Sequence, residues 1–155
     1  MERKDLIISA LLVVILILAG VLAKYSQDLS YCRDQLSETA KCMKYVLKVN
    51  LLIDYGNGTR RWHNGTLVPL GSSLLNATMQ VASVNYTLGT YGAFVNSING
   101  INNDKSRSMY WMYWVFREGK WVLGEVSADN FRLKDGDIVA WFYENCSKWP
   151  PEPPK

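Results

Sequence analysis

"MYWMYWVFREGKW", residues 109–121, holds three of the six tryptophans of this chain. Successive side chains of a β-strand point to opposite faces of the sheet. As a strand, this stretch places Tyr110, Met112, Trp114 and Phe116 on one face and Trp111, Tyr113 and Val115 on the other. A strand that is covered on one side alternates apolar with polar residues, whereas this strand is apolar on both faces. The pattern leaves open what covers the second face: more core, a partner or a ligand.

The segments that precede this strand predict a hairpin and then a helix. Residues 45–53, YVLKVNLLI, alternate apolar side chains with smaller and polar ones, which predicts a half-buried strand. The Gly/Asn-rich residues 54–58 predict a turn into a second strand within 59–70. Within residues 71–86 a Ser marks a helix start and is followed by an apolar stripe at helical spacing that includes Met79, which predicts a helix packed on a sheet. Asn76 falls on the solvent side of that helix.

Further strands are predicted at 93–98 and 137–144, and a polar loop at 99–108. The order of elements is strand, strand, helix, strand, strand, strand. That order indicates an α+β fold, a β-grasp-like mixed sheet with one packed helix. The helix of a β-grasp covers one face of the sheet, so the other face is a place to look for function. The domain is expected over 45–146, followed by a Pro-rich tail at 147–155.

The N-terminal region predicts a membrane anchor. Residues 6–23 are eighteen residues without a charge, behind a short charged cap at residues 1–5. As a helix they would be about 27 Å long, close to the thickness of a hydrocarbon core. The run exceeds the apolar core of about 7–15 residues of a signal peptide, so we expect an uncleaved transmembrane signal anchor. A secretory signal cleaved after Ala23 is the alternative.

Residues 24–44 predict a helical stalk. Leu22, Leu29, Leu36 and Met43 recur every seven residues, and Tyr25, Cys32 and Thr39 follow three places later. This pattern predicts a short parallel coiled coil and a homodimer through residues 22–43, with Cys32 placed for an inter-chain disulfide. The alternative is a helical spacer whose leucine face folds onto the domain or the membrane.

The cysteine count indicates at least one thiol without an intra-chain partner, since an outside protein with three cysteines has an odd number. Cys32 and Cys42 cannot pair within one unbroken helix, because about 15 Å separates them along its axis. Cys146 is left unexplained by the sequence.

Five glycosylation sequons indicate the side of the membrane on which the domain lies, whereas basic residues flank 6–23 on both sides. About 1.3 sequons would be expected by chance from this composition. The acceptors are Asn57, Asn64, Asn76, Asn85 and Asn145. The sequence therefore predicts a single-pass cell-membrane protein with a glycosylated domain outside.

Charge and chemistry exclude several function classes. The net charge is +3, and residues 45–146 carry nine Lys/Arg against eight Asp/Glu with no basic run, so no nucleic-acid partner is expected. His63 is the only histidine and has no recognisable nucleophile or orienting acid; an exposed hairpin residue explains it better. Asp135-Gly136-Asp137 fits a tight turn better than a carboxylate pair. No catalytic residue, no metal ligand and no enzyme activity are predicted.

The aromatic residues remain as candidates for ligand binding. They come from stretches that should neighbour one another in the sheet: Trp111, Tyr113, Trp114, Trp121, Trp141 and Tyr143. One interpretation is that they fill the core of a small domain. The other is that one set forms an aromatic platform on the helix-free face for a flat ligand, a sugar ring or another protein. The sequence does not say which set faces the helix.

Four motifs resemble a known family. GAFVNSING (92–100), YWMYWV (110–115) and LKDGDIVAWFY (133–143), after VPLGSSLLNA (68–77), are similar to the transcobalamin-like C-terminal domain. This β-grasp-like module, also catalogued as a domain of unknown function, occurs in bacterial and archaeal surface proteins and in the vitamin B12 carriers. The resemblance covers residues 45–145. The chain departs from the family at FREGKW, where the family commonly turns through Asn-Gly.

The resemblance implies a corrinoid as one ligand to consider. In the B12 carriers this domain closes over cobalamin held against a large helical barrel, and the barrel makes most of the contacts. Since these 155 residues leave no room for such a barrel, we expect no resident cofactor and a surface module that binds a small molecule or a surface protein. The alternatives are a structural subunit of a cell-surface layer or filament and, more remotely, an accessory in cobalamin-related uptake.

Overall fold

The computed structural model describes the backbone of residues 3–152 and the side chains of 11–12, 14–41 and 44–152. The chain divides into two compact units, residues 1–44 and residues 45–155.

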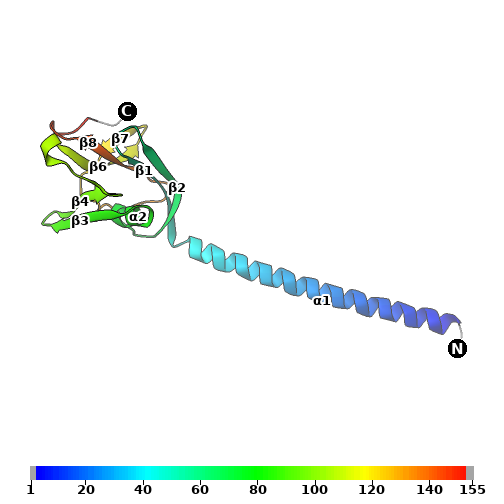
Figure 1. The fold of residues 1–155 in the computed structure, drawn as a ribbon. Helices are drawn as coiled ribbons and strands as arrows, with labels where there is room; N and C mark the ends of the chain where they lie inside the picture. Colours follow the sequence, from blue (N-terminus) through cyan, green and yellow to red (C-terminus); the bar gives the residue numbers. More distant parts are fainter. Residues whose placement is uncertain (1–2, 153–155) are drawn as a thin grey trace. The chain divides into compact units, whose positions relative to one another are not determined.

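The first unit is a single helix. α1 (Arg3–Met43) is continuous over 41 residues, so the predicted anchor and the predicted stalk are two parts of one element (Figure 1). Within the described residues, no helix combines the length and the hydropathy required to cross a membrane. The predicted anchor at 6–23 includes residues 6–10 and 13, whose side chains lie outside the described part.

The second unit is built around a five-stranded sheet with the order β2-β1-β8-β6-β7 (Figure 1). β1 and β8 are parallel, and the remaining neighbours are antiparallel. The predicted mixed sheet is therefore confirmed, with the first and last strands as its central pair. Its strands are β1 (Val46–Asp54), β2 (Arg60–Pro69), β6 (Met109–Arg117), β7 (Lys120–Leu123) and β8 (Ile138–Asn145).

The packed helix is shorter than predicted. α2 (Leu74–Val81) begins at the N-cap Ser73, whose hydroxyl accepts a hydrogen bond from the backbone N–H of Asn76 at 3.2 Å. It ends at Val81 because Ala82 adopts an extended backbone. The prediction of a helix over 71–86 was therefore wrong at its C-terminal end, where the chain turns into a strand.

A second, three-stranded sheet follows, with the order β3-β4-β5. Only β4 and the polar nature of the connection were predicted, so this sheet is an addition to the expected fold. Its elements and the short helix after it are β3 (Val84–Gly89), β4 (Gly92–Ile98), β5 (Ile101–Asn102) and the 3-10 helix η1 (Lys105–Arg107).

β7 was also absent from the prediction, and the turn before it explains why. Glu118 and Gly119 both have positive φ, 50° and 81°. A two-residue hairpin with two positive φ angles matches the twist of the strands, and Asn-Gly is its usual sequence. Here Glu-Gly makes the same turn, so the departure at FREGKW keeps the hairpin between β6 and β7.

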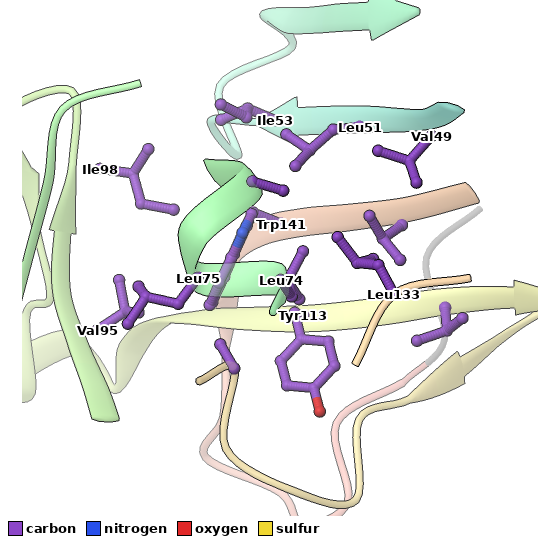
Figure 2. Packing of buried hydrophobic residues seen from close by; sticks show 14 of the residues in the cluster. Val49, Leu51, Ile53, Leu74, Leu75, Val95, Ile98, Tyr113, Leu133 and Trp141 are labelled. Carbon is purple, nitrogen blue, oxygen red and sulfur yellow. The ribbon is translucent and has the colours of Figure 1, made fainter. Parts of the chain in front are cut away.

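The main core lies between one face of the five-stranded sheet, α2 and β4. Figure 2 shows Trp141 and Tyr113 of the sheet among buried aliphatic side chains of these elements. Met79, which the predicted stripe placed on the buried face of the helix, is exposed, and Ala77 is buried instead. The fully buried side chains of this core include Val49, Leu51, Ile53, Val68, Leu74, Ile98 and Val139.

Two polar predictions have clear outcomes. Asp137 closes the turn before β8, as expected: it is buried, one carboxylate oxygen lies 2.9 Å from Nη2 of Arg117, and the other accepts the N–H of Lys134 at 2.9 Å. His63 is half-buried rather than exposed, because it lies opposite Leu51 on the core side of β2. Its Nε2 is buried and has no hydrogen-bond partner within the described residues.

Candidate functional site

β6 presents its two apolar sets to two different environments. Trp111, Tyr113 and Val115 point into the main core beneath α2. Trp114 lies on the opposite face of the sheet, in a smaller cluster. Burial thus answers which aromatic set faces the helix, a choice that the alternation alone leaves open.

Four of the six candidate binding residues belong to the main core. Trp111, Tyr113 and Trp141 are buried, and Tyr143 packs against them half-buried. Their polar hydrogens are used inside the domain, so they act as structural links. The donor–acceptor pairs are Trp111 Nε1 to Ile101 O, Tyr113 Oη to Val126 O, Trp141 Nε1 to Thr78 Oγ1 and Tyr143 Oη to Asn102 O.

The other two candidates, Trp114 and Trp121, lie on the face that α2 does not cover, called the helix-free face below. The Trp121 ring contacts the Phe142 ring edge-on, with centroids 5.7 Å apart. Trp121 is on β7, Phe142 is on β8, and β6 lies between these two strands. The contact between the two rings therefore passes over β6. This explains why Trp114 is only 3% exposed without a helix above it. The cluster is completed by Leu52, Leu123 and Ala140.

Trp62 was missed as a candidate and is the most exposed tryptophan of the helix-free face. It lies opposite Leu52 in the β1–β2 ladder, so it shares that face, and it is 47% exposed. The signal that could have found it is register: residues directly opposite in a ladder point to the same side. The sequence gives the hairpin but not the pairing of Leu52 with Trp62.

One end of the helix-free face is polar and hollow. A pocket of about 300 Å³ lies where β1 and β8 end. Asp54 is buried there. One of its carboxylate oxygens accepts a hydrogen bond from Nε–H of Arg60 at 2.6 Å, and the other accepts one from the backbone N–H of Gly56 at 2.9 Å. The pocket is lined by Asp54, Gly56, Gly58, Arg60, Phe142, Tyr143 and Glu144.

Glu144 connects this pocket to the aromatic cluster. Its Oε1 accepts the indole N–H of Trp114 at 2.7 Å. The pKa of Glu144 is raised to about 7, mainly by burial and also by the negative charge of Asp54, against the opposing effect of the Trp114 hydrogen bond. Near neutral pH this side chain therefore exchanges between a carboxylic acid that donates a hydrogen bond and a carboxylate that only accepts.

The chemistry of this face suits recognition. It combines the exposed ring of Trp62 with two carboxyl groups and a guanidinium around a concave pocket. In the described part of the chain, no three His, Cys, Asp or Glu side chains gather in an arrangement that could hold a metal ion.

Two further surface features bear on function. The β3–β4 hairpin carries exposed apolar side chains, namely Leu88, Tyr91 and Phe94, with Tyr91 91% exposed. The five sequon asparagines are all exposed, and they lie in the β1–β2 turn, β2, α2, β3 and the end of β8. Asn145 differs from the other four in the described hydrogen bonds, since its side-chain amide donates to Arg107 O at 2.9 Å. Its oxygen also accepts from Ser147 N at 2.9 Å.

Comparisons with known proteins bear on the fold. Residues 71–145 match the family described as a domain of unknown function, DUF4430. A structure of a proposed metal-binding protein from Ruminococcus gnavus is similar, with a TM-score of 0.51 and 19% identity over 64% of this chain and 97% of that chain. Haptocorrin in complex with Cbi is also similar, with a TM-score of 0.51 and 16% identity over 63% of this chain.

The chain spans only 25% of the haptocorrin chain, so the similarity concerns one part of that protein. A comparison with curated proteins found no match. The mixed sheet, the packed helix and the similarity to these two structures lead to the same conclusion about the fold. The globular unit of this chain has a transcobalamin-like fold, and its residues 71–145 match DUF4430.

Proposed function

We propose that this chain is a membrane-anchored, extracytoplasmic binding module that recognises a small molecule or a partner through the helix-free face. The observation that carries the proposal is the exposed Trp62, on the same face as the pocket lined by Asp54 and Glu144. The likeness to haptocorrin in complex with Cbi supports a binding role for this type of domain.

The face favours a ligand with a flat ring and hydrogen-bonding groups at its edge. An exposed indole provides a stacking surface, and an aromatic stack contributes about 0.5–1.5 kcal/mol beyond buried area. Carboxyl oxygens of Asp54 and Glu144 at the pocket accept hydrogen bonds from hydroxyl or amine groups. A sugar ring meets both requirements, and a corrinoid meets them through its flat ring and amide side chains.

The location is part of the proposal. Residues 6–23 carry no charge and support a single-pass anchor in the cell membrane. The sequons support an outside, glycosylated domain, since each acceptor asparagine is exposed: Asn57, Asn64, Asn76, Asn85 and Asn145. Nucleic acid is not among the proposed partners, because charges of both signs are balanced over residues 45–146. We also propose that the domain is not catalytic.

Tryptophan fluorescence of the full chain in detergent micelles tests the binding function. The probes are an oligosaccharide panel and cobinamide, titrated into the wild type and two variants. Trp62→Ala should reduce the affinity for a bound probe at least tenfold. Trp149→Ala is the matched control, since Trp149 is also exposed but lies in the C-terminal tail. Equal loss in both variants, or binding unaffected by Trp62→Ala, would contradict a site on the helix-free face.

A second candidate function is assembly of a cell-surface layer or filament. The observation that favours it is the exposed apolar tip of the β3–β4 hairpin, with Leu88, Tyr91 and Phe94. Tyr91→Ser should then reduce concentration-dependent oligomers in sedimentation experiments, whereas Trp62→Ala should not. A role in cobalamin-related uptake is the more remote alternative, and it requires cobinamide to be the probe that binds.

A further inference from the structure

The C-terminal half of α1 carries an exposed apolar stripe, which the helix itself cannot bury. Leu22, Leu29 and Leu36 are 70%, 59% and 68% exposed. They belong to a face defined by seven-residue spacing, called the seam below: Leu22, Tyr25, Leu29, Cys32, Leu36 and Thr39. The spacing continues through Leu18, Ile15 and Leu11, where every neighbouring position is also apolar and the pattern carries no information.

α1 also lacks the interactions that stabilise a helix standing alone. A solvated single helix depends on many ion pairs three or four residues apart. Within the described side chains of α1, the one such pair joins Lys41 to Glu38 at 3.9 Å, and it is well exposed. Most helices in proteins are stabilised by packing of an apolar face. We therefore expect the seam in the C-terminal half of α1 to pack against another apolar surface.

We propose that α1 pairs with the α1 of a second copy of this chain, parallel and in register along the seam. A repeat of 3.5 residues drifts by about 20° per heptad on a straight helix, and a left-handed supercoil of two helices removes that drift. The leucines then lie at the a positions, and Tyr25, Cys32 and Thr39 at the d positions.

Charge complementarity selects the parallel arrangement and its register. With Leu22 at an a position, Asp28 occupies g and Arg33 occupies e. In a parallel pair, a g residue faces the e residue five places further along the other helix. Asp28 and Arg33 are five residues apart, so Asp28 of each copy would pair with Arg33 of the other, which gives two opposite-charge pairs related by the two-fold axis. Neither residue forms an ion pair within the described part of its own chain, and an antiparallel pair would not bring them together.

Cys32 adds a covalent possibility at the centre of the seam. It is exposed, and its thiol is free. Two identical d positions of a parallel pair face each other at close to the Cα–Cα span of about 5.5–6 Å that a disulfide bridges. Exchange with a small disulfide oxidises the two thiols, which lose two protons and two electrons, and reduces that disulfide to two thiols. The disulfide rests on the proposed outside location, where such oxidants are present, whereas the packing does not.

Cross-linking of the full chain in detergent micelles tests the pairing. Wild type treated with oxidised glutathione should give a dimer on a non-reducing gel, which Cys32→Ser abolishes and Cys146→Ser does not. In a background without native cysteines, Tyr25→Cys at a d position should cross-link at least tenfold faster than Ser30→Cys, which faces away from the seam. Equal rates at the two positions, or no dimer in any variant, would overturn the proposal.

A charge swap tests the register. Asp28→Arg or Arg33→Asp alone should slow the cross-linking, and the double variant should restore it. Failure of the double variant to restore the rate would overturn the parallel register. A dimer that forms with added oxidised glutathione but not in cells would contradict the outside location and leave the pairing supported. None of these readouts involves a ligand of the helix-free face.

Discussion

The indole N–H of Trp114 donates a hydrogen bond to Oε1 of Glu144 at 2.7 Å, linking β6 to β8 on the helix-free face. Trp114 is almost fully buried beneath Trp121, and Glu144 lines the adjoining pocket. The hydrogen bond therefore couples a titratable group at the proposed site to the aromatic cluster that supports it. A change in the protonation of Glu144 acts on both.

We predict that the stability of the domain depends on pH through Glu144. The pKa of the folded state, about 7, lies above the ordinary value of 4.5, so the folded domain holds this proton more tightly than the unfolded chain does. The contribution is fully present below about pH 4.5 and is lost as the pH rises through 7. Glu144→Gln, which still accepts from Trp114, should stabilise the domain at pH 8 by about 1 kcal/mol after a discount for partial exposure.

Urea unfolding at pH 5 and pH 8 measures this effect. The matched control is Glu125→Gln, at an exposed glutamate with no described hydrogen bond to an indole. A pH dependence that Glu144→Gln leaves unchanged would contradict the assignment.

A paired glycine substitution should separate backbone strain from steric conflict. Gly56 and Gly58 have φ of 70° and 87°, so alanine at either position costs about 1 kcal/mol from the backbone alone. At Gly56 the added Cβ would also collide with the carbonyl oxygen of Tyr143, whereas at Gly58 it meets open space. We expect Gly56→Ala to lower the free energy of unfolding by about 2–4 kcal/mol. Equal effects in the two variants would contradict the close approach of this turn to β8.

Trp141→Phe should destabilise the core by about 1–3 kcal/mol. The substitution removes ring volume at a buried position and leaves the hydroxyl of Thr78 in α2 without its indole donor. Denaturant midpoints at pH 7 provide the measurement. Trp149→Phe, at an exposed residue of the tail, should stay within about 0.5 kcal/mol of wild type.

Sequon occupancy should differ among the acceptor asparagines. The amide of Asn145 donates to the carbonyl of Arg107, so a glycan on its nitrogen would remove one of the two protons available for that contact and crowd the end of β8. We expect mass spectrometry of the protein from a glycosylating host to find lower occupancy at Asn145 than at Asn76, which is exposed on α2. Higher occupancy at Asn145 would contradict this expectation.

The bounds of β1 and β8 were predictable to within one residue, whereas the stretch 109–121 contains β6, a turn and the start of β7. β1 alternates apolar side chains with smaller and polar ones, whereas β6 and β8 are continuous apolar runs rich in aromatic residues. β3 was missed although Val84, Tyr86 and Leu88 alternate with polar residues, because the predicted helix was continued to residue 86. The strand is exposed at nearly every position, so its burial does not follow that alternation. β7 is four residues long, and its turn is made by Glu118-Gly119 in place of the usual Asn-Gly.

The site was less predictable than the fold for a physical reason. Both faces of β6 are apolar, so hydrophobicity cannot distinguish the face beneath α2 from the helix-free face. The distinction depends on long-range packing, such as that of Thr78 in α2 against Trp141 in β8. The strand order β2-β1-β8 brings Trp62, Asp54 and Glu144 to the same face of the sheet. No local sequence pattern encodes that order.

The parallel pairing of β1 with β8 also has a mechanical consequence. β1 is the first strand after α1, and β8 is the last strand before the C-terminal tail. Because the two strands run in the same direction, tension between residues 45 and 146 would slide them lengthwise past each other. The hydrogen bonds between Asn50–Asp54 and Ile138–Phe142 would then share the force, whereas a hairpin pulled at its open end loses its bonds one by one. Tension applied between the two ends of the domain would therefore be resisted by this one pair of strands acting together.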